Sequence, residues 1–351
     1  MKNRKKNKVQ SEEFLKSIKP VYYISRFLGV FPFSISKRNT LKYVSRRWKA
    51  YSIVLLIFVI SCGVVSFRER VNSSELKVTI VVTESFLTIT TTITAAVGIL
   101  LNISVNQEKS INVMEKLFKI DKLIVPDYDV LYGKMCKFFI IHIIVVISCT
   151  IALFAYDVIV WLDEVSILYL MPSYPIRLIN ICIIVGFCDV VFLTKNRISI
   201  FNSKLEESLK DFKGFKDFTV NNRDFRIHDI NIVRIIPSRP ISDVIKNHST
   251  NLKYSKQEKL HELRLIWDDI CDIVSLINNM YGLLILFVIG VATIELLLSS
   301  YLVLATILNL QLAWLFLYFF KIISVTAPCQ SVVNEVENTE VFDSETFIVG
   351  R

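Results

Sequence analysis

Polar and aromatic side chains gather near one end of the long apolar runs in this sequence, and they have the chemistry of a binding site. A small-molecule site needs apolar and aromatic walls with a few polar groups that orient the ligand. The candidate ligand-binding residues are Tyr156, Asp157, Tyr174, Glu295, Gln311, Trp314 and Tyr318. An aromatic belt at a membrane surface explains the same residues. The residue types alone therefore leave a binding site and a belt both open.

Ionisable side chains inside the apolar runs are functional candidates by default, because a charge within a bilayer is costly. Glu295 lies well inside its run, where it either faces a cavity or marks the edge of the membrane. We expect Asp189 to pair with Lys195 or Arg197. We expect Lys321 to reach back to the membrane surface through its long side chain.

Catalytic and metal-binding patterns do not occur in the sequence. It has no phosphate-binding loop, HExxH pair, nucleophile elbow or EF-hand loop, and its 4 histidines are scattered. The 7 cysteines form no CxxC pair and are expected to be free. Basic residues lie at the edges of apolar runs rather than on a separate basic domain, which argues against nucleic-acid binding. We predict no enzyme activity, no catalytic residues, no metal and no cofactor.

The apolar residues are arranged for a membrane. They make up 53% of the 351 residues, and the mean hydropathy is +0.49. Runs long enough to span a bilayer cover about residues 50–67, 78–105, 138–162 and 172–194. A further block at 274–326 would be about 80 Å long as one helix, so it must fold back once, near residues 299–311. The expected fold is all-α: a multi-pass transmembrane bundle with six spans.

The distribution of basic residues predicts the orientation. Lys and Arg crowd the segment before the first span, which places the N-terminus in the cytoplasm. The expected organisation is a cytoplasmic segment at 1–49, four spans within 50–194, cytoplasmic helical extensions at 195–273 joined by a polar linker at 221–250, two spans within 274–328 and a cytoplasmic tail at 329–351. Asn72 heads the sequon "NSS" in a loop that this topology puts outside, so it is the candidate glycosylation site.

Three stretches resemble the insect gustatory receptor family, and together they extend over nearly the whole chain. They are "PVYYISRFLGVFPFSIS", "HELRLIWDDICDIVSLINNMYGLLILFVIGVATIELLLSSY" and "SVTAPCQSVVNEVENTEVF". The residues that carry the resemblance are Gly29, Pro32, Leu260, Leu263, Asn278, Tyr281, Gly282, Leu284, Cys329, Asn334, Glu335 and Thr339. Each stretch is weak alone, but their order and the predicted topology make the resemblance specific.

The resemblance implies a chemosensory receptor subunit in the plasma membrane. It implies a homo- or hetero-tetrameric ligand-gated cation channel, in contact with membrane lipid, that binds a small-molecule tastant in the outer half of its helices. It also implies a seventh span that lines the pore. The closing residues "DSETFIVGR" contain no apolar run. We therefore expect the chain as given to have six spans of an expected seven and not to conduct.

Two other functions remain as alternatives. A secondary transporter should show an internal repeat and broken helices at its substrate site, and the sequence has no such repeat and only 9 Gly and 8 Pro. A receptor of the G-protein-coupled kind needs an extracellular N-terminus, which the basic N-terminal segment opposes. No signature of a sugar or carbon dioxide receptor is present, so the tastant is left undefined.

Overall fold

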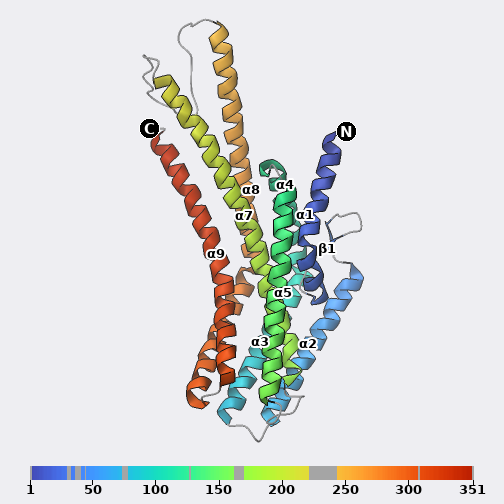
Figure 1. Ribbon diagram of the computed structural model, residues 1–351. Coiled ribbons are helices and arrows are strands. Elements are labelled where there is room, and N and C mark those ends of the chain that lie inside the picture. Colours follow the sequence, from blue (N-terminus) through green and yellow to red (C-terminus); the bar gives the residue numbers. More distant parts are fainter. Residues whose placement is uncertain are drawn as a thin grey trace.

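The computed structural model describes residues 2–29, 33–35, 41–43, 45–72, 78–125, 128–161, 170–220, 243–306 and 309–349. Over these residues it is a bundle of long helices (Figure 1). The helices are α1 (Lys2–Phe27), α2 (Arg46–Asn72), α3 (Val78–Ser104), α4 (Asn106–Ile124), α5 (Tyr128–Trp161), α7 (Ser173–Val220), α8 (Asp243–Thr306) and α9 (Asn309–Val349). Two short strands, β1 (Phe33–Ile35) and β2 (Leu41–Tyr43), pair antiparallel beside α1.

Among the described residues, six helices are long and apolar enough to cross a membrane: α2, α3, α5, α7, α8 and α9. The predicted all-α multi-pass bundle with six spans is confirmed. The predicted fold-back is also present, because α8 ends at Thr306 and α9 begins at Asn309. The break lies where polar residues interrupt the apolar block and where a single helix would far exceed the roughly 30 Å of a bilayer core.

The bundle has two distinct ends (Figure 1). At the hairpin end, α2 is followed by α3, α5 by α7 and α8 by α9. The terminal end carries both chain termini, and there α7 and α8 project beyond α4. With 48 and 64 residues, these helices are about 72 and 96 Å long, which far exceeds the roughly 30 Å of a bilayer core. The predicted linker at 221–250 is too long, because α8 already begins at Asp243; residues 221–242 lie outside the described residues.

The N-terminal segment contributes to the core, which the sequence analysis did not predict. In α1 the apolar residues recur on one face, and Phe14, Leu15, Ile18, Val21 and Tyr22 are buried in the main apolar cluster. These residues alternate with Lys and Glu, so they form no apolar run. The helix stops before Gly29, whose positive φ of 70° suits the left-handed residue that ends many helices.

A buried ion pair fastens α4 to α7. The Arg197 guanidinium donates to both carboxylate oxygens of Asp121, at 2.8 and 2.6 Å, and the Tyr132 hydroxyl of α5 donates to the same carboxylate at 3.0 Å. The expected partner of Asp189 was therefore wrong. Asp189 instead lies 2.9 Å from the His142 ring, because α5 packs beside the face of α7 that carries it.

Ion pairs also tie α4 to α8 near the terminal end. Lys116 lies 2.6 Å from Asp272, and Lys119 lies 2.6 Å from Asp269. Burial acts to lower the pKa of Lys116, but hydrogen bonds and charge from Asp272 and Asp269 outweigh it and raise the pKa overall. Such partly exposed pairs contribute little stability each, at about 0–1 kcal/mol, so they serve mainly to set the register of the two helices.

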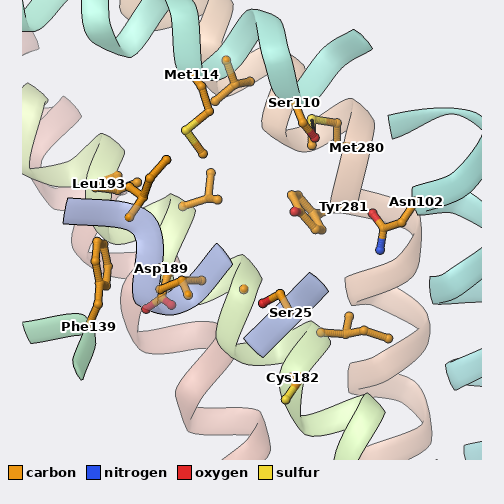
Figure 2. Close-up of a pocket in the computed structure, with 16 residues that line it drawn as sticks. Ser25, Asn102, Ser110, Met114, Phe139, Cys182, Asp189, Leu193, Met280 and Tyr281 are labelled. Atoms are coloured by element: carbon orange, nitrogen blue, oxygen red, sulfur yellow. Dashed lines mark hydrogen bonds between the residues drawn. The ribbon is translucent and has the colours of Figure 1, made fainter. Parts of the chain in front are cut away.

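A cavity of about 40 Å³ lies inside the bundle between α1, α3, α4, α5, α7 and α8 (Figure 2). Most of its wall is apolar, including Phe139, Met114 and Met280. Polar side chains also face it, among them Asp189 and Ser25. The cavity is separate from the residues that the sequence analysis selected as a ligand site, since none of them lines it.

Candidate functional site

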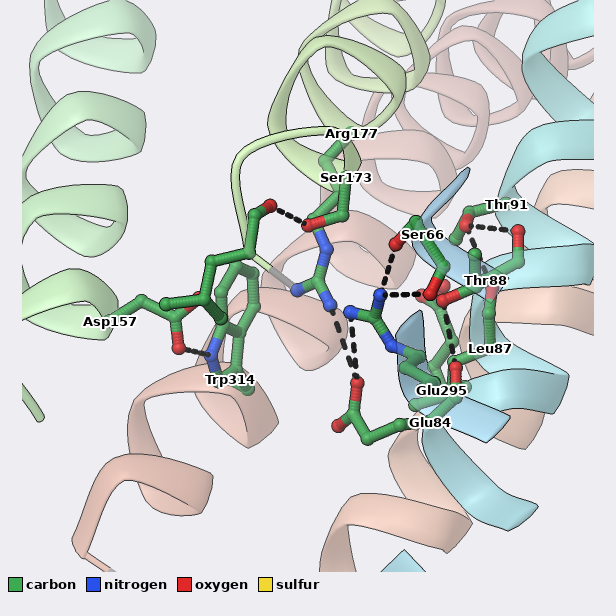
Figure 3. Close-up of polar contacts among 12 residues, drawn as sticks. Ser66, Glu84, Leu87, Thr88, Thr91, Asp157, Ser173, Arg177, Glu295 and Trp314 are labelled. Carbon is green, nitrogen blue, oxygen red and sulfur yellow. Dashed lines mark hydrogen bonds and ion pairs between the residues drawn. The ribbon is translucent and has the colours of Figure 1, made fainter. Parts of the chain in front are cut away.

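Most of the predicted ligand-binding residues come together near the hairpin end. We call the group they form the hairpin-end cluster, and several of its members are shown in Figure 3. It consists of Arg70, Glu84, Asp157, Tyr174, Arg177, Glu295, Trp314, Tyr318 and Lys321. Helices α2, α3, α5, α7, α8 and α9 each contribute at least one residue. The cluster thus joins all six helices that, in the described part of the chain, are long and apolar enough to span a membrane.

Asp157 is the hydrogen-bond acceptor that joins three helices in the cluster. The Tyr174 hydroxyl of α7 donates to Oδ2 at 3.1 Å, and the Trp314 indole of α9 donates to Oδ1 at 3.2 Å. Asp157 is 5% exposed, so these donors replace the water that a carboxylate would otherwise bind. Any molecule that displaces either donor must offer one of its own.

Aromatic rings form a wall beside this carboxylate. Phe154 stacks on Tyr174 with centroids 4.4 Å apart, and Trp314 lies 6.1 Å from Tyr318. The Arg177 guanidinium lies 4.0 Å from the centre of the Trp314 ring, a distance at which cation–π attraction is effective. The wall therefore combines flat apolar surface with a fixed positive charge.

Two arginines converge on Glu84 of α3. Arg70 and Arg177 both point at the same oxygen, Oε2, from 3.7 and 3.9 Å (Figure 3). These distances exceed those of good hydrogen bonds, so the contacts are mainly electrostatic. Nη1 of Arg177 is buried and has no hydrogen-bond partner within the described part of the chain. The guanidinium of Arg177 thus retains a donor that is not used in this arrangement.

Glu295 and Lys321 form the part of the cluster between α8 and α9. The Lys321 ammonium donates to Glu295 at 3.1 Å and lies 4.8 Å from the Tyr318 ring centre. The side chains are only 2% and 11% exposed. Lys321, two turns along α9 from Trp314, therefore does not reach the membrane surface as expected, because the buried Glu295 carboxylate of α8 holds it inside the bundle.

Charge in the cluster is balanced by residue type. The acidic side chains are Glu84, Asp157 and Glu295, and the basic ones are Arg70, Arg177 and Lys321. Burying unpaired charge is costly, and pairing of this kind limits that cost. The charged groups therefore compensate one another within the cluster.

The other residues that the sequence analysis selected do not belong to the hairpin-end cluster, or their side chains lie outside the described residues. The Tyr156 side chain is 40% exposed, because neighbours on a helix point about 100° apart and Asp157 takes the inward direction. Gln311 belongs to α9, but its side chain is outside the described residues. Asn72 is the last residue of α2 and is exposed at the hairpin end.

The sequence analysis did not select Arg70, Glu84 or Arg177. A usable signal was present, since Glu84 lies inside the run at 78–105 and Arg177 lies inside the run at 172–194. Charged residues inside membrane spans are functional candidates by default. If we had applied this rule to every charged residue within the predicted spans, it would have selected both Glu84 and Arg177. Their pairing still requires the packing of α3 against α7.

The far part of α9 is held at the terminal end. The Asn202 amide of α7 donates to the Glu335 carbonyl at 2.8 Å, and the Thr339 hydroxyl donates to Asn202 Oδ1 at 2.6 Å. Glu335 and Thr339 belong to the third stretch used for the resemblance above. Helix α9 is thus one continuous helix that contacts the hairpin-end cluster near its start and α7 near the terminal end.

The described residues contain no group of three or more His, Cys, Asp or Glu side chains placed to hold a metal ion.

The chain was compared with protein families and with curated proteins. The family model described as 7tm Chemosensory receptor matches residues 18–342. No curated protein matches the chain.

Proposed function

Because the chain belongs to the 7tm chemosensory receptor family, we propose that it is a gustatory receptor subunit that binds a small-molecule tastant at the hairpin-end cluster. The family accounts for a chemoreceptor role in a multi-pass membrane protein. Taste as the sense served, the plasma membrane as the location and the hairpin end as the outward-facing end are our proposals. They extend the resemblance and the basic N-terminal segment described above.

The observation that carries this proposal is the single face of α9 that contacts the other helices of the cluster. Trp314, Tyr318 and Lys321 recur at helical spacing and contact Asp157, Arg177 and Glu295 from α5, α7 and α8. A ligand that enters among these groups changes the contacts of α9 directly. Since α9 continues to Glu335 and Thr339 at the opposite end, its displacement there is the signal we propose.

The proposed output is cation flow through a homo- or hetero-tetramer of such subunits. Both the oligomer and conduction are proposed from the family resemblance. The long α7 and α8 offer surface on which neighbouring subunits would pack outside the membrane. We propose that ligand binding at the hairpin end is transmitted along α9 to this region.

The test is a tastant screen on cells that express this chain together with other subunits of the family. For a tastant that evokes a calcium or current response, Trp314→Phe removes the indole donor to Asp157 while it keeps an aromatic ring. We expect the half-maximal concentration to rise by about tenfold, equivalent to about 1.4 kcal/mol for a lost hydrogen bond to a charged group.

The matched control is Trp48→Phe, because Trp48 lies at the start of α2, far along the helix from the hairpin end, and packs on Arg26. This variant should respond as the unmodified chain does. Equal sensitivity of Trp314→Phe and the unmodified chain, at equal surface expression, would show that the ligand binds elsewhere.

A further inference from the structure

The cavity between α1 and α7 contains a buried carboxylate whose hydrogen bonding is incomplete. Asp189 is 2% exposed, and one of its oxygens, Oδ1, lies 2.9 Å from Nδ1 of His142. The other oxygen, Oδ2, is buried and has no hydrogen-bond partner within the described part of the chain. A buried carboxylate oxygen left without a donor or a cation is strongly disfavoured. Within the described part of the chain nothing meets this oxygen, so it is open to a proton, a water or a cation.

The surroundings of Asp189 supply little positive charge. The side chains that line the cavity are Ile18, Val21, Ser25, Asn102, Ser110, Val113, Met114, Phe139, Cys182, Ile183, Asp189, Val190, Leu193, Met280 and Tyr281, beside Gly186. No Lys, Arg or second carboxylate is among them. His142 contacts Asp189 from α5, and no other charged partner of Asp189 is found in the described residues. Asp189 is therefore the only acidic or basic side chain among the residues that line the cavity.

We propose that this cavity binds one monovalent metal cation of the size of Na⁺ or K⁺, held by the Asp189 carboxylate and the Ser25 hydroxyl. Its volume of about 40 Å³ is sufficient, because a water-sized occupant needs only about 10–15 Å³ by the same measure. The cavity therefore has room for an ion and a water that completes its coordination. Figure 2 shows Asp189 on α7 and Ser25 on α1 at the cavity wall.

The chemistry of the lining selects the class of ion. Carboxylate, hydroxyl and amide oxygens are hard ligands, which suit alkali and alkaline-earth cations rather than zinc or copper. A divalent ion takes several carboxylates or retains most of its waters, and this cavity offers one carboxylate and little space. One negative charge matches one positive charge. A site with a single acidic residue has no sequence motif, which is why the sequence analysis predicted no metal.

The ion would join helices that are distant in sequence. Ser25 belongs to α1, Asp189 to α7 and His142 to α5, so occupancy would stabilise the docking of the N-terminal helix against the spans. This inference does not depend on the proposed ligand site, because no residue of the hairpin-end cluster lines the cavity. We expect a variant that no longer binds the cation in the cavity to keep the proposed ligand site, and the reverse.

The experiment measures thermal unfolding of the purified full chain in detergent at constant ionic strength, with choline chloride replaced by NaCl or by KCl. Choline is too large for the cavity. We expect the unfolding midpoint to rise by about 2 °C or more as the metal ion reaches about 150 mM, because an ion that binds only the folded state stabilises it. The salt that gives the larger shift identifies the preferred ion.

The variant Asp189→Asn keeps the shape and removes the charge, so the metal-dependent shift should disappear. The matched control is Asp269→Asn, a carboxylate of α8 that pairs with Lys116 and Lys119 and does not line the cavity, and it should retain the shift. Should Asp189→Asn not fold, Ser25→Ala serves, and it should at least halve the shift. A separate readout is saturable binding of radioactive sodium to the purified chain, which Asp189→Asn should abolish.

Two results would overturn the proposal. Equal unfolding midpoints in choline, sodium and potassium, together with no saturable sodium binding, would mean that water or a proton satisfies Asp189. A metal-dependent shift that persists unchanged in both Asp189→Asn and Ser25→Ala would place the ion elsewhere in the molecule.

Discussion

Asp121 and Arg197 meet through two short contacts, and neither side chain is more than 1% exposed. Arg197 also donates to the Leu193 carbonyl, and Asp121 also accepts from Tyr132. At the scale of single residues, both charges of this pair are satisfied by several contacts. Each charge depends on the other, because removal of one partner leaves the other buried and uncompensated.

Replacement of Arg197 by Met tests this dependence. Asp121 would keep only the Tyr132 donor, so we expect a loss of about 3–5 kcal/mol in folding stability. The change should appear as a lower unfolding midpoint and a lower yield of monodisperse protein in detergent.

The control for the loss of a positive charge nearby on α7 is Lys204→Met, since the Lys204 ammonium donates only at a longer distance, 3.3 Å, to the Leu123 carbonyl. It should unfold within about 1 kcal/mol of the unmodified chain. If the two variants are equally stable, the buried pair does not hold α4 to α7.

At the scale of helices, α2 and α3 approach closely at Gly63. A Cβ added there would lie 2.5 Å from Thr92 Cγ2 and 3.1 Å from Thr92 Cβ. Thr92 is β-branched and its hydroxyl is held by the Thr88 carbonyl, so it cannot move aside freely. Small residues at such positions allow helix backbones to pack tightly in a membrane.

We predict that Gly63→Ala separates α2 from α3 and lowers the unfolding midpoint, with a cost of about 1–3 kcal/mol for overpacking. Gly133→Ala is the matched control, because an added Cβ at Gly133 meets nothing within 4 Å. That variant should be neutral or slightly stabilising, since Ala favours helix over Gly. Equal behaviour of the two variants would argue against close packing at Gly63.

The contact of α9 with α7 at the terminal end is a second property of helices. We predict that Thr339→Val, which removes the donor to Asn202 Oδ1, increases hydrogen–deuterium exchange in the last turns of α9 by about fivefold, as expected for the loss of about 1 kcal/mol. Thr326→Val is the control, because the Thr326 hydroxyl bonds only within its own helix, to Ile322 and Ile323. Unchanged exchange in Thr339→Val would mean that apolar packing alone holds this part of α9.

At the scale of the whole molecule, the orientation in the membrane determines which end can meet a tastant. The basic N-terminal segment predicts that the terminal end is cytoplasmic. An epitope tag at Met1 should therefore be labelled only after cells are permeabilised. Labelling of intact cells would place the hairpin end inside and would favour a receptor of the G-protein-coupled kind.

Asn72 provides an independent check on the same orientation, because it is exposed at the hairpin end. Any glycosidase-sensitive shift of the chain on a gel should be abolished by Asn72→Gln. A shift that survives Asn72→Gln and is lost in Asn247→Gln would place the long extensions outside the cell.

The extent of prediction differed between elements for a physical reason. The spans were predicted because bilayer thickness sets a length of apolar sequence that can be read without knowledge of neighbours. Helix α1 was not predicted, because charged residues interrupt its apolar residues Phe14, Ile18 and Val21. These residues form a buried face only where α1 packs against α4 and α5. The extensions of α7 and α8 were predicted from helical spacing, but the start of α8 was misplaced by several residues.

By itself the sequence determined the class of the protein, the number of apolar helices and the point where α8 turns into α9, since each depends on local hydropathy and length. It also supplied most members of the hairpin-end cluster as residue types. Only the tertiary structure decided which charges meet. Asp157 and Trp314 are 157 residues apart, and Arg197 is 76 residues from Asp121. A buried charge takes whichever partner the packing of helices brings within reach, and that packing is a property of all the helices together.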